Sequence, residues 1–245
     1  MIDLNRYNRY IAGLPDRELT KEDLLVPELL IEEQDDLKMY YIPFNTVNAE
    51  AKVFIIGITP GFTQMEIAIR QARTDFLNGL PDEEVYRRAK RQASFAGSMR
   101  RNLIAMLDEL GLPDALSLRS SADLFQNRND LLHTTSVVRY PVFAKGRNYT
   151  GHNPEILKSP MLSRFACGLF RWEIETVGQA LVIPLGKAVS GVLRHFINEG
   201  IVPENRCLLD FPHPSGANGH RRPQFESLKS EHRKRIADWF GASQA

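Results

Sequence analysis

The stretch Ala51–Gly61, AKVFIIGITPG, decides the fold. It is a continuous apolar run, rich in β-branched residues, that stops at a Gly-x-x-Pro-Gly turn. Such a run is typical of a strand buried on both faces, which is a parallel strand at the centre of a sheet. The glycines and the proline predict a tight turn whose backbone N–H groups can face a ligand, with a helix starting soon after.

Three further runs resemble this one, at Leu131–Val138, Gln179–Leu185 and Arg206–Phe211, and helical patterns separate them. Strands that alternate with helices predict an α/β domain, in which helices cover both faces of a parallel sheet. We therefore expect a three-layer α/β/α fold around a central four-stranded parallel sheet. A chain of 245 residues suits a single domain of this class.

Two segments stand apart from this alternation. Residues 1–50 contain eleven acids and five bases, and the spacing of Leu, Val and Ile within 19–36 predicts an acidic helical extension packed on the main domain. Residues 62–94 predict a helical insert. Since the whole chain has a net charge of +1, residues 51–245 carry +7, and this part is where a polyanion would bind.

The composition excludes several classes of protein. Cys167 and Cys207 are the two cysteines, and their isolation excludes a disulfide framework and a four-cysteine zinc or iron–sulfur site, so we expect no metal or cofactor. No run approaches the roughly 18 apolar residues that span a bilayer, and the first ten residues lack the apolar core of a secretory signal. We expect a cytoplasmic protein with no membrane partner, and take a monomer as the default while the oligomeric state stays open.

Ligands of open α/β sheets bind beyond the carboxyl ends of the strands, so the segments that follow the predicted strands are the place for a site. His213 follows the last strand, and the prolines on either side restrict its backbone and aim its imidazole. Two acid-free basic stretches, 85–107 and 131–154, lie along the chain, and the first surrounds Phe95. Basic groups interleaved with an aromatic ring suit phosphate contact and base stacking. A solvated helix face explains the basic run at 87–91 equally well.

These segments resemble the uracil-DNA glycosylase superfamily. GITPG at 57–61 resembles its first motif, and HPSGANGHR at 213–221 resembles its His-Pro-Ser motif. Three intervening stretches match in the expected order: FAGSMRRNL at 95–103, TTSVVRYPVFAKGRNYTG at 134–151 and IPLGKAV at 183–189. The resemblance covers about residues 40–240 and identifies a divergent member.

The resemblance implies an enzyme of base-excision repair, which flips a damaged base such as uracil out of single- or double-stranded DNA and hydrolyses its bond to deoxyribose. It gives His213 the role of hydrogen-bond donor to the departing base, and Phe95 that of a stacking platform. Base binding is further assigned to Gly57, Ile58, Pro60, Gly61 and Ser136. DNA contacts are assigned to Ser215, Asn218, His220, Arg221, Arg222, Arg139, Lys145 and Arg147.

Two residues depart from the family pattern. Thr59 stands where most members have an Asp or Asn that orients the attacking water, and a threonine hydroxyl cannot act as a base at neutral pH. Losing such a group typically costs about two to four orders of magnitude in rate, unless a carboxylate such as Asp210 or Glu66 substitutes. Ser136 stands where the family commonly uses Asn to recognise uracil, so the base is left open.

Three functions therefore remain as alternatives. The first is a DNA N-glycosylase, free of metal and cofactor, with His213 and Thr59 as its catalytic residues. The second is a catalytically weak or inactive module that binds nucleic acid or a nucleobase. The third is an enzyme that acts on a free nucleoside or nucleotide. DNA binding would weaken steeply with salt through counterion release, whereas nucleoside binding would not.

Overall fold

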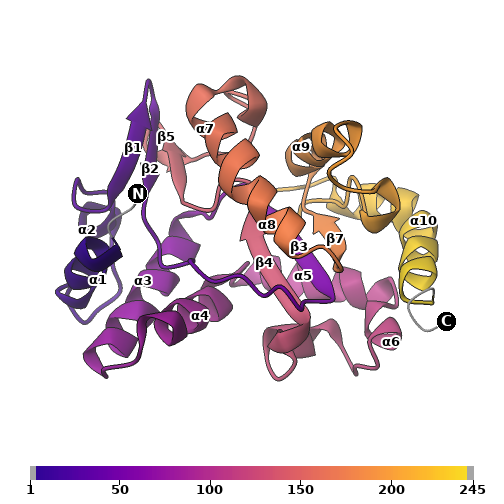
Figure 1. The fold of residues 1–245 in the computed structure, drawn as a ribbon, viewed down its shortest axis with the longest axis horizontal. Coiled ribbons are helices and arrows are strands. Elements are labelled where there is room, and N and C mark those ends of the chain that lie inside the picture. The colour runs from indigo at the N-terminus through magenta and orange to yellow at the C-terminus, as the bar shows by residue number, and fades with distance from the viewer. Residues whose placement is uncertain (1–3, 242–245) are drawn as a thin grey trace.

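A three-stranded parallel sheet lies at the centre of the computed structural model, which describes residues 4–241 (Figure 1). Its strands are β3 (Val53–Gly57), β4 (Leu132–Ser136) and β7 (Leu181–Pro184), in the order β4-β3-β7. All five residues of β3 are buried, because the strand has a neighbour on each side and helices on each face. The apolar run at 51–61 therefore forms the middle strand and the turn that follows it.

The predicted fourth strand at 206–211 is wrong. This segment reaches the sheet through one parallel bridge, between Val182 and Cys207, and through the Leu208 N–H, which donates to the Val182 carbonyl at 2.9 Å. Asp210 then takes a φ of 59°, which lies outside the range that an extended strand requires. The α/β class is thus confirmed, with three parallel strands in the central sheet.

Helices cover both faces of this sheet. They are α1 (Leu4–Ala12), α2 (Lys21–Leu24), α3 (Phe62–Leu77), α4 (Asp82–Ala93), α5 (Ser98–Glu109), α6 (Leu112–Ala115), α7 (Pro160–Phe165), α8 (Arg171–Thr176), α9 (Lys187–Asn198) and α10 (Arg221–Gly241). Residues 62–94 form α3 and α4, as the helical insert predicts. No helix within residues 4–241 is long and apolar enough to cross a bilayer.

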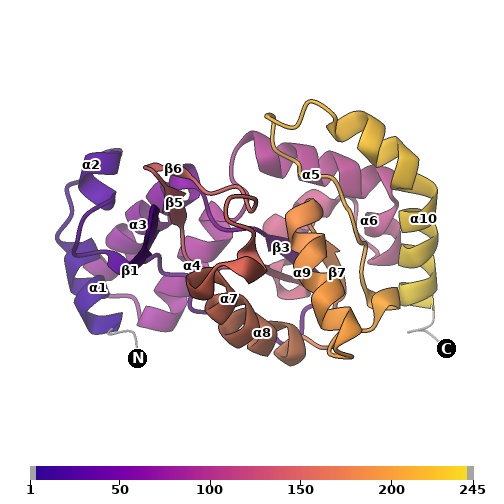
Figure 2. The same cartoon turned by 90° about the horizontal axis from the view of Figure 1, so that it is seen from above.

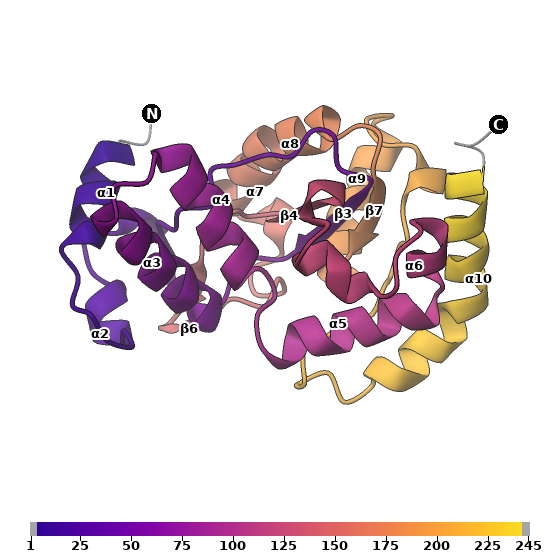
Figure 3. The same ribbon diagram turned by 90° about the horizontal axis from the view of Figure 1, so that it is seen from below.

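Alternate residues of β3 enter two separate cores. Phe54 and Ile56 belong to a cluster that also contains the buried residues of α8 and α9, whereas Val53 and Ile55 belong to one that contains those of α5 and α10. Figures 2 and 3 show these helix pairs on opposite sides of the sheet. Because successive side chains of a strand point to opposite faces, β3 contributes to both cores.

The N-terminal extension is less helical than predicted. After α1 and α2 the chain forms a hairpin of β1 (Leu30–Gln34) and β2 (Leu37–Tyr40), with Asp35 in the turn at a φ of 53°. β2 pairs with β5 (Val142–Ala144), and β5 pairs with β6 (Arg147–Asn148), giving an antiparallel sheet in the order β1-β2-β5-β6. This sheet ties the extension to a segment about a hundred residues later in the chain (Figure 2).

Arg206 joins the last segment of the sheet to the end of α8. Its buried guanidinium donates from Nε to the Ala180 carbonyl at 2.6 Å, from Nη1 to the Ile174 carbonyl at 3.3 Å, and from Nη2 to the Val177 carbonyl. The carbonyls at a helix C-terminus have no partner within the helix. Arg206 thus donates to the Ile174 and Val177 carbonyls at the end of α8 and to the Ala180 carbonyl just before β7.

We expect Arg206→Met to lower the free energy of unfolding by about 3 kcal/mol, because the substitution leaves buried carbonyls without donors. Urea denaturation measures this loss. Arg164→Met is the control, since Arg164 is exposed and pairs with Glu32 at the surface, where an ion pair contributes less than about 1 kcal/mol. Equal losses in the two variants would contradict the role given to Arg206.

Candidate active site

Gly57 ends β3 at a point where two other candidate residues approach it. A Cβ placed on Gly57 would lie 3.2 Å from Phe95 Cε1 and 3.2 Å from Ser136 Oγ. Phe95 itself has a φ of 54°, which is uncommon for an aromatic residue and marks a constrained backbone. Three residues that the sequence assigns to base binding therefore meet at one point, and a larger residue at Gly57 would separate them.

The Thr59 hydroxyl is bound within the protein. It donates to the Tyr140 carbonyl at 2.7 Å and accepts from the Val142 N–H at 3.1 Å. These bonds connect the turn after β3 to the segment that leads into β5. The proton of this hydroxyl is donated within the protein, so Thr59 stabilises the turn after β3.

The turn is held further by Asn148, which the sequence did not single out. Its Oδ1 accepts from the Phe62 N–H at 3.0 Å, at the start of α3, and its side-chain amide lies 3.1 Å from a Cβ placed on Gly61. Pro60 is buried, and Ile58 is half-buried against Gly151. In the sequence, Asn148 could have been noticed as an amide within an acid-free basic loop. Its partner Phe62 is 86 residues away along the chain, so the sequence gives no sign of this contact.

His213 has a defined tautomer in its neutral form. The Ser215 N–H donates to His213 Nδ1 at 3.3 Å, so the neutral ring carries its proton on Nε2. Burial lowers the pKa of His213 below its ordinary value, which favours the neutral ring at pH 7. The group can therefore offer one N–H donor from Nε2.

Backbone hydrogen bonds place His213 at the same edge of the sheet as the turn after β3. Ile56 pairs with Pro184 in the parallel register, and the Leu185 N–H donates to the Ile56 carbonyl at 2.9 Å. The Gly186 N–H donates to the Phe211 carbonyl at 2.8 Å, two residues before His213. A Cβ on Gly186 would lie 3.3 Å from His213 Cβ, so glycine is needed where this loop meets α9.

Contacts around Gly151 complete this edge. A Cβ on Gly151 would lie 2.7 Å from Ala188 Cβ, at the start of α9, and 3.3 Å from Ile58 Cγ2. The loop after β6, the start of α9 and the turn after β3 therefore touch one another. We call the group of residues 57–61, 95, 136, 186–188 and 213 the carboxyl edge; Gly57, Phe95 and Ser136 are buried within it.

The comparisons with known proteins supply a relative of almost the same length. No family model matches the sequence. The chain is 46% identical over 235 residues to a Bacillus subtilis (strain 168) protein with the name "Uncharacterized protein YoxB", and the alignment covers 95% of this chain and 91% of YoxB. The chain belongs to the YoxB family. The name of this relative states no activity.

In this member of the YoxB family, the loop from His213 to Arg222 is tied to two helices. The Pro214 carbonyl accepts from Asn102 Nδ2 of α5 at 2.8 Å and from Arg221 Nη1 of α10 at 3.3 Å. Asn218 Nδ2 donates to the His213 carbonyl at 3.2 Å. These bonds fix the backbone that carries His213.

The remaining loop residues assigned to DNA lie close to solvent. His220 is exposed, and Ser215 Oγ accepts from the Ala217 N–H at 3.2 Å. Arg222 is exposed and pairs with Glu109 at 2.5 Å and with Glu226 at 2.8 Å. Part of its positive charge is therefore already balanced within the protein.

Arg139 is not part of the exposed basic surface, which corrects its assignment to DNA. Its guanidinium is buried and donates from Nε to Glu173 Oε1 at 2.7 Å, because β4 leads it into the core beside α8. Lys145 and Arg147 are exposed around the β5–β6 turn, and Lys145 pairs with Asp36 at 3.2 Å. These two residues keep their positions on the surface near Asn148.

The two carboxylates considered as substitutes for a catalytic base are both engaged. Asp210 receives Arg194 Nη1 at 3.0 Å and Nη2 at 2.5 Å, and the side-chain hydrogen bond from Arg194 lowers the pKa of Asp210. Glu66 is buried and accepts from Arg70 Nε at 2.7 Å. Neither carboxylate is a free base at the carboxyl edge.

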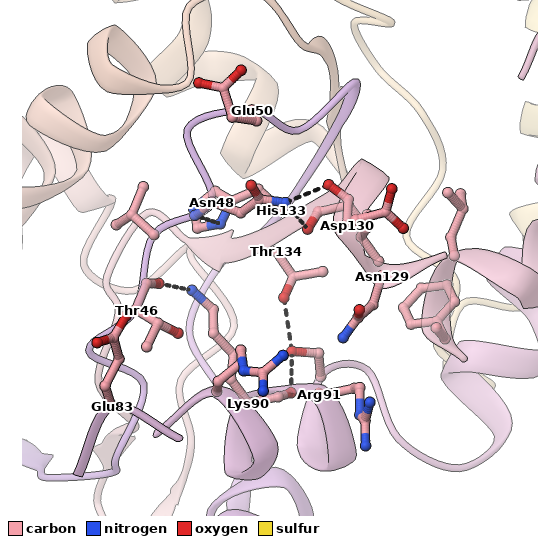
Figure 4. A pocket seen from close by; sticks show the side chains of 16 residues that line it. Thr46, Asn48, Glu50, Glu83, Lys90, Arg91, Asn129, Asp130, His133 and Thr134 are labelled. Carbon is pink, nitrogen blue, oxygen red and sulfur yellow. Dashed lines mark hydrogen bonds between the residues drawn. The ribbon is translucent and has the colours of Figure 1, made fainter. Parts of the chain in front are cut away.

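Two cavities of this YoxB-family protein lie elsewhere. One, of about 400 Å³, lies beside α4 (Figure 4), and the other, of about 830 Å³, lies between the β1–β2 turn and residues 153–160. Neither is lined by Gly57, Phe95 or His213. Within residues 4–241 no cluster of three His, Cys, Asp or Glu side chains could hold a metal ion. The carboxyl edge is thus defined by close contacts between its residues, of Phe95 and Ser136 with Gly57 and of His213 with Gly186, and not by either cavity.

We expect Thr59→Val to lower the free energy of unfolding by about 1–3 kcal/mol, because the Val142 N–H loses its acceptor and the turn loses a connection to residue 140. Thermal or urea denaturation measures the change. Thr63→Val is the control, since Thr63 is exposed in the first turn of α3 and should change the stability by less than about 0.5 kcal/mol. A neutral Thr59→Val would show that this hydroxyl is free for another role.

Proposed function

We propose that this member of the YoxB family is a DNA N-glycosylase of the kind that the uracil-DNA glycosylase superfamily exemplifies. We propose for it the same three-layer fold, in which the segment from Arg206 to Phe211 runs beside β7 in place of a fourth strand. The observation that carries the proposal is the position of His213, whose Nε2–H donor belongs to the same sheet edge as the contact between Gly57, Phe95 and Ser136.

The chemistry suits a neutral donor. When the bond between a base and deoxyribose breaks, negative charge develops on the departing base and is delocalised onto a carbonyl oxygen attached to its ring. A donor aimed at that oxygen stabilises the transition state more than the ground state, and one such donor typically contributes 10²–10³-fold in rate. His213 Nε2–H is this donor in our proposal, and Ser215 holds the ring in the required tautomer through its N–H.

The other residues at the edge would hold the base. Phe95 offers an aromatic face, and base–aromatic stacking contributes about 1–3 kcal/mol without selecting among bases. Ser136 offers one hydroxyl, which can donate and accept but lacks the paired groups of an amide. The proposal therefore includes a relaxed preference for the base, with uracil as one candidate among deaminated or oxidised bases.

The proposed enzyme is slow. Thr59 donates its proton to the Tyr140 carbonyl, and Asp210 and Glu66 are paired with arginines, so none of the three residues considered for water activation is free. General-base assistance is typically worth 10²–10⁴-fold. The rate would then come from stabilisation of the leaving base.

The DNA strand would run over the basic residues beside the edge, all of them exposed except the half-buried Arg221. Arg147 and Lys145 lie on one side, and Arg221, Arg222 and His220 lie on the other, at the start of α10. Arg221 Nη1 donates to the Pro214 and Ser215 carbonyls, so a phosphate there would also touch the loop that carries His213. Each such contact makes affinity depend on salt.

A non-catalytic binding module is the second candidate, and the engaged Thr59 hydroxyl favours it. It shares the DNA surface and the base platform with the glycosylase, and differs in turnover alone. The same oligonucleotides can therefore decide between the two functions.

We expect the protein to release at least one base from a panel of labelled single- and double-stranded oligonucleotides that carry uracil, hypoxanthine, xanthine or 5-hydroxymethyluracil. Alkaline cleavage at the abasic site measures release under single-turnover conditions. His213→Ala should lower the rate about 10²–10³-fold, because it removes the donor to the departing base. His195→Ala is the matched control, since His195 lies on α9 and pairs with Glu199 at 3.3 Å.

Binding of the same oligonucleotides with no release of any base would contradict the glycosylase and support the binding module. Loss of activity in both histidine variants alike would point to a fault in folding, which circular dichroism detects. Neither binding nor release by the folded wild-type protein would contradict both functions.

A further inference from the structure

A cavity of about 400 Å³ lies beside the amino end of β4 and the residues that lead into β3 (Figure 4). Residues 46–50, which lead into β3, form one wall, and α4 forms another. The short helical turns at 121–131 and the first residues of β4 close it. A volume of this order is within the usual range for small-molecule sites.

Lys90 places a buried amine, partly protonated at pH 7, in the wall of this cavity. Its side chain is 6% exposed, and its Nζ donates to the Thr46 carbonyl at 2.7 Å. An ammonium group has three donors, and this carbonyl is the one hydrogen-bond acceptor that the described residues offer it. Burial lowers the pKa of Lys90 to about 7, although the charge of Glu173 opposes the shift. A buried ammonium without an acid in contact is costly unless an anion joins it.

Arg91 adds a second cation on the same side. It is exposed and forms no ion pair within the part of the chain that the structure describes. Arg87, which also lines the cavity, is paired with Glu84 at 3.0 Å between Nε and Oε2. Positions 87, 90 and 91 lie on one face of α4, because residues three and four apart in a helix are neighbours, and Ser94 follows the end of the helix.

Apolar and polar groups also line the cavity. Leu124 and the ring of Phe125 line it, and Arg100 lies 5.1 Å from the centre of that ring. Ser94 Oγ donates to the Lys90 carbonyl at 2.7 Å and lies 2.8 Å from Thr134 Oγ1, so both hydroxyl protons are used within the protein and the pair offers a ligand acceptor lone pairs alone. An aromatic wall with a few polar groups is the usual lining of a site for a planar organic ligand.

Three carboxylates also line the cavity, and all three side chains are at the exposed rim: Glu50, Glu83 and Asp130. Asp130 is already paired with Arg128 at 3.1 Å. Figure 4 shows Glu50 and Asp130 across the cavity from Lys90 and Arg91. Solvent and salt screen exposed charges much more than buried ones, so Lys90 dominates the interior.

We propose that this cavity binds a small organic anion with a planar ring, whose phosphate or carboxylate group contacts Lys90 and Arg91 and whose ring packs against Phe125. This site is separate from the carboxyl edge. Along β4, His133 lines the cavity whereas Ser136 lies at the edge, and three residues of strand span about 10 Å.

The test is isothermal titration of the full-length protein with adenosine 5′-monophosphate, benzoate, inorganic phosphate and adenosine. We expect adenosine 5′-monophosphate or benzoate to bind, and to bind at least about tenfold more tightly than adenosine or inorganic phosphate, since each of the latter lacks one of the two contacts. Binding of the monophosphate alone identifies a phosphate ligand, and binding of benzoate alone identifies a carboxylate ligand. Either of these two results supports the proposed site.

Substitutions locate the ligand. Lys90→Met and Arg91→Gln should each weaken binding about tenfold or more, because each removes a charge-assisted contact. His213→Ala and Lys234→Gln are controls at the carboxyl edge and on α10, and should bind as the wild type does. Arg91 is exposed, so its variant keeps the test valid even if Lys90→Met does not fold.

Three results would overturn the proposal: no binding of adenosine 5′-monophosphate or benzoate at millimolar concentration, wild-type affinity in Arg91→Gln, or loss of binding in His213→Ala. Loss of binding in His213→Ala would show that the ligand binds at the carboxyl edge, the site of the proposed glycosylase, and not in this cavity.

Discussion

The burial of β3 on both of its faces is the constraint on which the rest of the structure depends. Val53 and Ile55 pack into one core and Phe54 and Ile56 into the other, so the strand cannot shift by one residue without exchanging the two sets. Gly57 is thereby fixed in the position where Phe95 and Ser136 approach within 3.2 Å of its missing Cβ. The same packing that stabilises the sheet positions the candidate site.

The sequence predicted this centre well because each strand there is a local apolar run bounded by a turn. It failed at 206–211, where the run looks similar but Asp210 takes a left-handed conformation and the segment meets β7 at a single bridge. It also failed at 19–36, where apolar spacing suited a helix. The hairpin there depends on pairing with β5, which lies more than a hundred residues further along the chain.

In the candidate site, too, local patterns could be predicted from the sequence and long-range contacts could not. Gly57, Phe95, Ser136 and His213 could be named from motifs, because each belongs to a short local pattern. The engaged state of Thr59 and the burial of Arg139 could not, since their partners Tyr140 and Glu173 are set by tertiary packing. Lys90 is the clearest example of a residue whose environment could not be predicted. It lies within a run of arginines on a helix, and nothing in the sequence distinguishes it from a solvent-exposed lysine.

The two ends of the sheet carry different electrostatic environments. Lys90 and His133 are buried towards the amino end, and Arg139, which follows the carboxyl end of β4, meets His133 at the buried Glu173. Burial alone would raise the pKa of Glu173, but the hydrogen bond with His133 and the charges of Arg139 and Lys90 hold it below its ordinary value. At the carboxyl end, burial lowers the pKa of His213. A buried Arg139–Glu173 ion pair with a neutral His133 thus supports the core beside α8, and a neutral donor, His213, is available at the carboxyl end.

The most direct test of the central claim is a long-range ¹H–¹⁵N NMR titration of His213, assigned by comparison with His213→Ala. The account predicts a pKa below the ordinary value of about 6.5 and, above that pKa, a proton on Nε2. A neutral ring with its proton on Nδ1, or a pKa above the ordinary value, would contradict the donor on which the proposed function rests.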